Sequence, residues 1–287
     1  HLLYLNLNDV RIESNKEHEV LGRFIGHRLR SEFQPIFDTS VADGLLGYEA
    51  LLRPSTGIED VSPQFAFGIA EHEDKLVKLD RIARTLHMLN YLQLPDDKGF
   101  LFLNVHPKLL TKVSAHGRVF EQVLHRHSVP TRQVVIEIIE NGVEADSALK
   151  EAVDNYRDRG YQIAIDGFGS QHSNLDRLWQ LSPHFVKLDL SIIRRAQANA
   201  KIKRSIPKLL DIIHSVGAQP IVTGIENEVQ LDLALDAGAK LLQGYFLQKP
   251  ASVSSWTRPL KARQDSALMP GAPVHFGSFS AAAQYAL

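Results

Sequence analysis

The sequence predicts an α/β fold, a closed (β/α)8 barrel of the TIM type. Apolar strand-like runs alternate with amphipathic helical stretches between residues 33 and 247. Such alternation is typical of βα units with a mainly parallel sheet, and roughly eight strands in about 220 residues suit a closed barrel. Seven of the apolar runs also carry a polar side chain at or near their carboxyl end. A barrel gathers those ends at one rim, where its active site lies.

A doubly wound open sheet is the alternative fold for the same alternation of strands and helices. That fold usually places a glycine-rich phosphate loop directly after its first strand. No such loop follows the first apolar strand of this sequence, so the closed barrel is favoured.

The first part of the chain is expected to reach the barrel through a helix and a hairpin. Residues 2–12 fit a strand or the end of a linker, and the apolar spacing over residues 17–32 predicts a helix. A short strand at 33–37 and the apolar run ending at Arg53 flank a turn-rich stretch, which favours a hairpin. Helices are expected over 62–71, where Ser62 precedes a proline, and over 74–92.

The rest of the barrel is predicted as regular βα units. The expected strands cover residues 100–105, 133–139, 162–166, 185–190, 220–225 and 241–247. The expected helices cover about 116–127, 144–159, 173–180, 191–216 and 227–237. Three regions follow: 1–16 as the linker end of a longer parent protein, 17–251 as the barrel domain, and 252–287 as an irregular tail. The first residue is His1 rather than Met, which also indicates a fragment.

Composition excludes several classes of protein. The net charge is −1 with both signs mixed along the chain, so no concentrated basic face is expected and a nucleic-acid polymer is not the predicted partner. The absence of cysteine excludes disulfides and cysteine-based zinc sites. No apolar run reaches the roughly 20 residues of a membrane span, and no signal peptide is visible. A cytoplasmic domain, whose parent protein is free to carry a membrane anchor, is the resulting expectation.

Four polar residues at strand ends form the candidate metal site. They are Glu49, Asn104, Glu137 and Asp166, and their oxygen-only chemistry suits Mg²⁺ or Mn²⁺. Each one alone is more simply explained as a polar strand terminus with a local hydrogen bond. All four together, inside apolar runs, are costly to bury without a cation, which favours the metal.

Two basic residues are the candidate contacts for an anion. Lys187 lies inside an apolar strand and either contacts a phosphate or an attacking water, or forms a salt bridge to a neighbouring carboxylate. Arg53 either holds a phosphate with two hydrogen bonds or forms a surface or inter-loop ion pair. Gln243 is a weak signal alone, and the thirteen histidines show no metal-binding spacing.

The ordered motifs of the chain resemble those of the EAL domain family, barrels that hydrolyse the bacterial second messenger cyclic di-GMP to linear pGpG. The resemblance covers roughly residues 20–250. Its motifs are Phe33-Gln-Pro-Ile36, Gly47-Tyr-Glu-Ala-Leu-Leu-Arg53, Leu103-Asn-Val-His-Pro107, Ile136-Glu-Ile-Ile-Glu140, Asp166-Gly-Phe-Gly169, Val186-Lys-Leu-Asp189 and Gln243-Gly-Tyr245. The family's first strand is antiparallel to the others, as the expected hairpin allows.

The resemblance implies a role for each matching residue. Glu49, Asn104, Glu137 and Asp166 match ligands of the first metal, and the family clamps the scissile phosphate between two ions. Lys187 matches the residue beside the hydrolytic water, and Gln243 completes the rim. The implied ligand contacts are Gln34 to a guanine, Arg53 to a phosphate, and also Asp189 and Tyr245. Glu140 matches the residue that supports the loop after the Asp166 strand.

The sequence departs from the family pattern at two catalytic positions. Gly167 replaces an aspartate that binds the second metal, and Thr223 replaces a catalytic glutamate. Glu226 is the candidate substitute for the missing carboxylate. The loop 168–174, which couples the metal site to the family's dimer interface, is also altered. We therefore expect at most one tightly bound divalent ion.

Three functions are compatible with these residues. The favoured one is a degenerate EAL domain that binds cyclic di-GMP as a receptor and has weak or lost hydrolysis. A slow, divalent-metal-dependent phosphodiesterase giving pGpG is the alternative, and a structural or interaction domain without nucleotide is the third. A homodimer through the helices beside the Asp166 and Lys187 strands, and further domains in the parent protein, are also expected.

Overall fold

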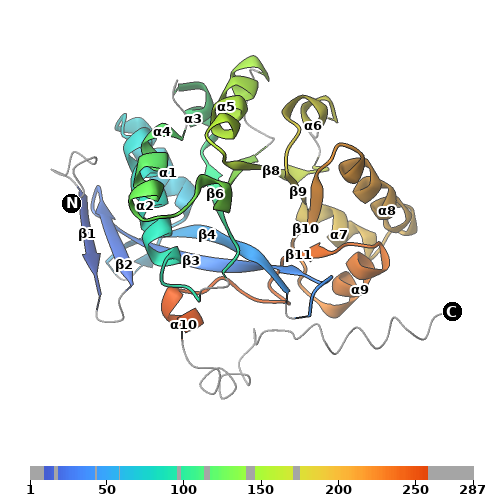
Figure 1. The fold of residues 1–287 in the computed structure, drawn as a ribbon. Coiled ribbons are helices and arrows are strands. Elements are labelled where there is room, and N and C mark those ends of the chain that lie inside the picture. Colours follow the sequence, from blue (N-terminus) through green and yellow to red (C-terminus); the bar gives the residue numbers. More distant parts are fainter. Residues whose placement is uncertain are drawn as a thin grey trace.

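The computed structural model of the protein is a closed ring of strands with helices around it (Figure 1). It describes residues 10–15, 19–42, 44–57, 59–95, 98–112, 117–139, 146–170 and 175–257. The barrel strands are β3 (His27–Asp38), β4 (Gly44–Thr56), β6 (Phe100–Val105), β7 (Val134–Ile139), β8 (Gln162–Phe168), β9 (Phe185–Leu188), β10 (Gln219–Val222) and β11 (Leu241–Leu242).

Pairing around the ring confirms the predicted (β/α)8 barrel. From β4 through β6, β7, β8, β9 and β10 to β11, neighbouring strands run parallel. Strand β3 closes the ring between β11 and β4 and is antiparallel to both. The predicted hairpin and the antiparallel first strand are therefore both confirmed.

The helices cover the outside of the ring. They are α1 (Pro63–His72), α2 (Leu76–Tyr91), α3 (Pro107–Lys112), α4 (Arg118–Arg126), α5 (Asp146–Asp158), α6 (Leu175–Leu181), α7 (Leu190–Ala196), α8 (Ala200–Ser215), α9 (Glu228–Asp236) and α10 (Val253–Thr257), with a 3₁₀ turn η2 at Thr131–Gln133. Side chains cap several of their starts. Ser62 Oγ accepts from the Phe65 amide at 3.1 Å, and Asn227 Oδ1 accepts from the Gln230 amide at 3.0 Å.

The helix predicted over residues 17–32 is wrong. This region forms strand β2 (Val20–Phe24) and the start of β3, joined by a turn in which Ile25 and Gly26 have positive φ. Strand β1 (Val10–Ser14) pairs with β2, and β5 (Glu59–Asp60) pairs with β4. Tertiary contacts override the helical spacing here, because both backbone groups of Val20 hydrogen-bond to the Asn90 side chain on α2 at 2.8 Å.

Other predicted boundaries shift. The helix expected at 191–216 is two helices, α7 and α8. Asn199 separates them, because its Oδ1 accepts from the amides of Lys201 and Ile202 at 2.9 and 3.3 Å and starts a new helix. The strands expected at 220–225 and 241–247 end at Val222 and Leu242, where the chain turns away from the ring.

The inside of the ring is filled by an apolar layer below the rim. Its members are Ile36, Phe102, Val135, Ala164, Phe185, Ile221 and Leu241, each from a different strand. A second, larger core lies between the strands and the surrounding helices. The interior is therefore packed, and a ligand site is expected only above this layer.

The outer face of β3 and β4 is covered by the end of the described chain. Phe33 and Ala251 form a β-bridge, and the Trp256 ring lies 5.4 Å from the Tyr48 ring. The predicted irregular tail thus begins with helix α10, and residues 258–287 lie outside the described part. Within the described residues, no helix combines the length and apolar character that crossing a membrane requires.

Candidate functional site

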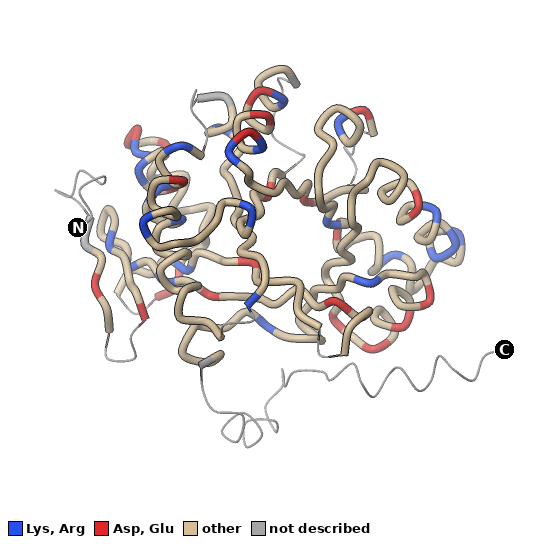
Figure 2. Tube along the Cα trace, in the orientation of Figure 1, with Lys and Arg blue, Asp and Glu red and all other residues tan. Residues whose placement is uncertain are grey.

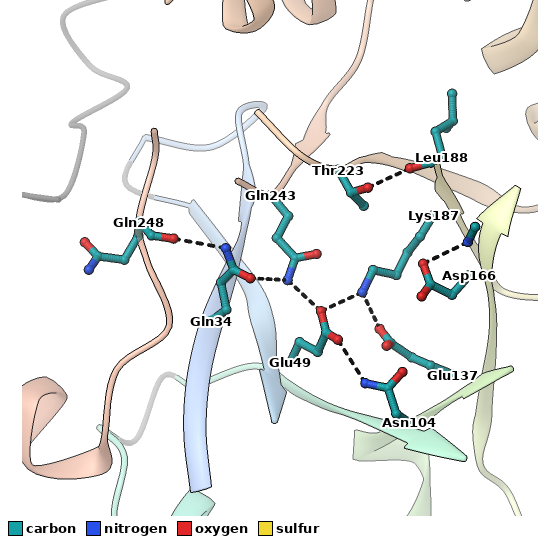
Figure 3. Close-up of polar contacts among 11 residues, drawn as sticks. Gln34, Glu49, Asn104, Glu137, Asp166, Lys187, Leu188, Thr223, Gln243 and Gln248 are labelled. Atoms are coloured by element: carbon teal, nitrogen blue, oxygen red, sulfur yellow. Dashed lines mark hydrogen bonds and ion pairs between the residues drawn. The ribbon is translucent and has the colours of Figure 1, made fainter. Parts of the chain in front are cut away.

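The site is a second layer of side chains, polar instead of apolar, directly above the apolar layer. On most strands of the ring its member lies two residues from an apolar-layer residue. The polar-layer residues are Gln34, Glu49, Asn104, Glu137, Asp166, Lys187, Thr223 and Gln243 (Figure 3). Because side chains alternate along a strand, a two-residue step keeps both layers inside the barrel. The structure thus brings together all four predicted metal ligands.

Glu49 on β4 is the centre of the hydrogen-bond network. Its Oε1 accepts from Asn104 Nδ2 at 2.9 Å. Its Oε2 accepts from Lys187 Nζ at 2.7 Å and from Gln243 Nε2 at 2.8 Å. Burial alone would raise the pKa of Glu49, but Lys187 and the two amides together hold that pKa below its usual value. Glu49 is therefore fixed in its ionised form.

Lys187 joins Glu49 to a second carboxylate, that of Glu137. Its Nζ donates to Glu137 Oε1 at 2.9 Å, and both side chains are buried. Burial and the nearby Glu49 charge raise the pKa of Glu137 well above its usual value, against the opposing pull of Lys187. Burial would lower the pKa of Lys187, but Glu137 and Glu49 outweigh it and raise that pKa. The salt bridge left open for Lys187 is thus present.

Asp166 ends the cluster on β8. Its Oδ1 accepts from the Gly167 amide at 2.9 Å. Burial raises the pKa of Asp166 despite the attraction of Lys187. Gly167 itself has φ +78°, and a Cβ placed there would meet no atom within 4 Å. A side chain at position 167 therefore has room, although the backbone conformation favours glycine.

Thr223, the residue directly after β10, lies in the polar layer without adding a charge. Its Oγ1 donates to the backbone carbonyl of Leu188 at 2.6 Å, which ties β10 to the end of β9. A hydroxyl in this bond is neither a strong metal ligand nor a base at neutral pH. The polar layer therefore holds three carboxylates, from Glu49, Glu137 and Asp166.

On the other side of Glu49, two side-chain amides and the backbone carbonyl of Gln248 continue the network. Gln243 Nε2 also lies 3.5 Å from Gln34 Oε1, and Gln34 Nε2 donates to the Gln248 carbonyl at 3.1 Å. Sequence reasoning missed Gln248. The only signal for it is its place five residues after Gln243, in the loop that the antiparallel first strand faces.

The remaining predicted residues lie outside this network. Arg53 Nε donates to Glu32 Oε2 at 2.7 Å, so Arg53 forms an ion pair, and this pair joins strands β4 and β3 rather than two loops. Glu226 is bound by Arg194 Nη2 at 3.0 Å and, within the described chain, has no hydrogen bond or ion pair to the three carboxylates. Asp189 caps α7 by accepting from the Ser191 amide, and Tyr245 is 52% exposed. Glu140 lies outside the described residues.

The donor chemistry fits one divalent ion. Glu137 Oε2 is buried and has no hydrogen-bond partner among the described residues, so it is an orphaned acceptor at the centre of the cluster. Carboxylate and amide oxygens are the donors that Mg²⁺ and Mn²⁺ prefer. In the described part of the chain, however, no three acidic or histidine side chains converge closely enough to hold a metal by themselves. Lys187 lies between Glu49 and Glu137 instead.

The chain is similar to a known protein family and to several characterised and uncharacterised relatives. The EAL domain family model matches residues 18–250. YkuI of Bacillus subtilis, described as an uncharacterized EAL-domain containing protein, is 29% identical over 237 residues, which are 80% of this chain and 57% of YkuI. The cyclic di-GMP phosphodiesterase RocR of Pseudomonas aeruginosa is 26% identical over 76% of this chain and 57% of RocR. The chain therefore spans little more than half of either relative.

Solved structures share the barrel. A standalone versatile EAL protein from Vibrio cholerae O395, in its c-di-GMP bound form, is 26% identical with a TM-score of 0.67, over 78% of this chain and 93% of that one. BlrP1 of Klebsiella pneumoniae, in a manganese/cy-diGMP complex, has a TM-score of 0.72 at 21% identity, over 86% of this chain and 59% of that one. The likeness to BlrP1 shows the fold alone.

Proposed function

Since this chain belongs to the EAL domain family, we propose that it binds cyclic di-GMP at the polar rim of the barrel and hydrolyses it slowly or not at all. The observation that carries the proposal is the contrast within the polar layer. The network around Glu49 is complete, whereas positions 167 and 223 supply no carboxylate. A receptor needs the first feature, and a two-metal hydrolase also needs carboxylates for a second ion.

The proposed ligand contacts follow from charge and position. Arg53 lies on β4, four residues beyond Glu49 along the strand, and is half-buried against Glu32. A guanidinium held in this way can turn toward a phosphate and make two parallel hydrogen bonds. Gln34 is proposed to read a guanine edge, with Asp189 and Tyr245 as further contacts at the rim. The V. cholerae protein, which has a c-di-GMP bound form, supports the choice of ligand.

We propose that one Mg²⁺ or Mn²⁺ is held by Glu49, Asn104, Glu137 and Asp166. When bound, such an ion polarises the phosphate and lowers the pKa of a coordinated water. The chain's own residues orient this site: Asn104 and Gln243 fix the Glu49 carboxylate, and Lys187 offsets the charges of Glu49 and Glu137. Without carboxylates at 167 and 223, a second ion has too few ligands, so we expect a single tight site.

The alternative is an active phosphodiesterase that gives pGpG, and one observation favours it. All four residues proposed for the first metal site lie in one layer, and Glu137 Oε2 is left without a partner in the described chain. The relative RocR is a cyclic di-GMP phosphodiesterase, which supports this reading as well. Thr223 or Glu226 would then need a catalytic role, although Glu226 is bound by Arg194.

Calorimetric titration with cyclic di-GMP in Mg²⁺, Mn²⁺ and chelator, followed by chromatography of the products, tests the proposal. We expect saturable binding without appreciable pGpG. The Arg53→Lys variant should bind about tenfold more weakly, because it loses the second hydrogen bond. Arg30→Lys is the matched control, since Arg30 lies opposite Arg53 on β3 and pairs with Asp60. Absence of binding would leave the structural or interaction role, and turnover near about 1 s⁻¹ would establish the alternative.

The homodimer stays a prediction, and the surface suggests how it would form. The helices beside the Asp166 and Lys187 strands are α6, α7 and α8. Helix α6 exposes Leu175 at 41% and Trp179 at 57%, which suits a contact between copies. We propose that pairing uses α6, and light scattering of Trp179→Glu against the unmodified chain tests it. A monomer in both samples at high concentration would remove the dimer.

A further inference from the structure

Helices α7 and α8 carry a concentration of positive charge that composition alone conceals. Residues 190–210 contain six lysines or arginines and no aspartate or glutamate, in a chain of net charge −1. The six are Arg194, Arg195, Lys201, Lys203, Arg204 and Lys208, and all are exposed. Figure 2 shows these cations gathered along the helices on one side of the barrel. The expectation that the chain has no concentrated basic face is therefore wrong for this segment.

Most of these cations are not used by the fold. Within the described residues, Arg194 forms an ion pair with Glu226, whereas the other five have no acidic partner. In the part of the chain that the structure describes, Arg195 donates to the Ser191 carbonyl within its own helix. A surface that neutralised its own charge would show more such pairs, so this one is open to an anionic partner.

The geometry of α8 turns the charge outward. Lys201, Arg204 and Lys208 follow one another at spacings of three and four residues and therefore share one face of the helix. Leu210 and Ile213 lie on the other face and are buried against the barrel. Lys203 is exposed beside this face, and the four cations of α8 together form a convex ridge rather than the lining of a pocket.

Local helix stability does not explain these residues. Asn199 caps α8, and the first turn of the helix contains no acidic residue. Lys201, Lys203 and Arg204 lie in its first two turns, where the helix dipole favours acidic side chains and disfavours cations. A charge pattern that works against its own helix points to a function outside the helix.

We propose that the α7–α8 surface rests on the anionic headgroups of a lipid bilayer. Clusters of four to eight lysines and arginines on an amphipathic helix bind such headgroups through diffuse charge, which a convex ridge can present to a plane. Residues 190–210 contain no Phe, Tyr or Trp on which nucleic-acid bases could stack. The apolar face of α8 is already buried, so the contact is peripheral and electrostatic rather than inserted.

Co-sedimentation of the full chain with phospholipid vesicles tests this proposal. We expect binding to vesicles containing phosphatidylglycerol at low salt, little binding to pure phosphatidylcholine, and loss of binding at about 0.5 M salt. Reversal of the ridge should weaken binding to the anionic vesicles by about 100-fold or more. The ridge variant combines Lys201→Glu, Lys203→Glu, Arg204→Glu and Lys208→Glu. Acidic residues at the start of α8 suit the helix dipole, so the variant should fold, as circular dichroism can verify.

A matched variant separates the ridge from net charge. It reverses four exposed cations on other faces of the molecule and changes the net charge by the same amount: Arg118→Glu, Arg132→Glu, Lys240→Glu and Lys249→Glu. The proposal requires this variant to keep most of its vesicle binding. Equal losses in both variants would overturn it, as would absence of binding to anionic vesicles at low salt. Tighter binding of an oligonucleotide than of the vesicles would identify a nucleic acid instead.

Discussion

The barrel interior has two layers of side chains, which come from the same strands. One layer is apolar and contains no charged side chain, whereas the other is polar and contains three carboxylates and a lysine. On seven strands, or at the residue directly after them, the members lie two residues apart: Ile36 and Gln34, Phe102 and Asn104, Val135 and Glu137, Ala164 and Asp166, Phe185 and Lys187, Ile221 and Thr223, Leu241 and Gln243. On β4 the residue two before Glu49 is Gly47, where a Cβ would lie 2.2 Å from the Phe100 carbonyl oxygen.

The apolar layer stabilises the barrel, whereas the polar layer has the composition of a binding site. Burial of the apolar layer stabilises the fold directly. The polar layer places three carboxylates around one lysine, and the raised pKa values of Glu137 and Asp166 show that their charge is costly there. Such an arrangement makes sense if a cation or an anionic ligand completes it.

The largest expected effect comes from adding charge to the polar layer. Gly167→Asp with Thr223→Glu should raise pGpG formation by about 10³-fold or more, because both carboxylates serve one metal cluster. A side chain at position 167 has room, and the left-handed backbone costs about 1–2 kcal/mol for a residue other than glycine. Each single variant should gain little. Product chromatography with Mn²⁺ measures the effect.

The matched control for this repair is Gly167→Asn with Thr223→Gln, which has the same shapes without the charges. It should remain inactive, and Glu49→Ala in the repaired protein should abolish hydrolysis again. Equal activity in the control would mean that the contrast between the layers has nothing to do with the missing carboxylates. Hydrolysis of cyclic di-GMP at a normal enzymatic rate by the unmodified chain would also contradict the proposal that its catalytic site is degenerate.

Removing a side chain from the apolar layer should have the next largest effect, a loss of free energy of unfolding rather than a change in activity. Phe185 is buried, and its ring lies 5.5 Å from that of Phe102. Phe185→Ala should lower the free energy of unfolding by about 3–5 kcal/mol, through lost burial and the cavity left behind. Urea unfolding should give the same loss with Mn²⁺ and with chelator. Recovery by Mn²⁺ would show that the two layers are not independent.

The neighbouring polar-layer residue should behave differently under the same measurement. Lys187→Met leaves Glu49 and Glu137 buried without their cation, and we expect a loss of about 3 kcal/mol in chelator. Mn²⁺ should restore part of that loss by binding the folded state. Phe185→Leu serves as a milder comparison that Mn²⁺ should not affect. If the Lys187 variant were insensitive to Mn²⁺, the single metal site would be refuted.

The sequence predicts the barrel well but the first strands and one helix boundary poorly. Regular alternation of strands and helices from residue 62 onward identifies the barrel, because each unit buries its apolar face in the same way. The 17–32 region has apolar residues at helical spacing, yet Asn90 and α2 hold it as strands, and no local pattern records that long-range contact. The break between α7 and α8 depends on the Asn199 cap, a signal that the apolar stripe obscures.

The membership of the polar layer is predictable, but its contacts are not. Strand ends and motif spacing identify Glu49, Asn104, Glu137 and Asp166, since parallel strands align their ends. Which carboxylate Lys187 contacts depends on strand tilt and rotamers, which a sequence does not encode locally. The binding of Glu226 by Arg194, from a neighbouring helix, has the same origin. The sequence shows that position 167 is a glycine, but only the structure shows that its φ is positive.

The smallest expected effect comes from Glu137→Gln, which removes one carboxylate from the polar layer. This substitution should stabilise the folded chain. Burial and Glu49 raise the pKa of Glu137 above its ordinary value of 4.5, so the folded chain keeps this proton when the unfolded chain has lost it. The carboxyl's contribution to stability is therefore present at low pH and falls as the pH rises from about 4.5 through the raised pKa. Glu137→Gln cannot titrate, and Lys187 retains Glu49 as its partner.

In chelator the stability of the Glu137→Gln variant should match that of the unmodified chain near pH 4.5 and exceed it by about 1–2 kcal/mol at neutral pH. Urea unfolding across this range measures the difference, and exposed Glu151→Gln on α5 should show none. With saturating Mn²⁺ the order should reverse, because glutamine is a weaker metal ligand than a carboxylate. A variant less stable than the unmodified chain in chelator at neutral pH would mean that the polar layer is stabilising by itself. The two layers would then differ in the polarity of their side chains, but both would stabilise the fold.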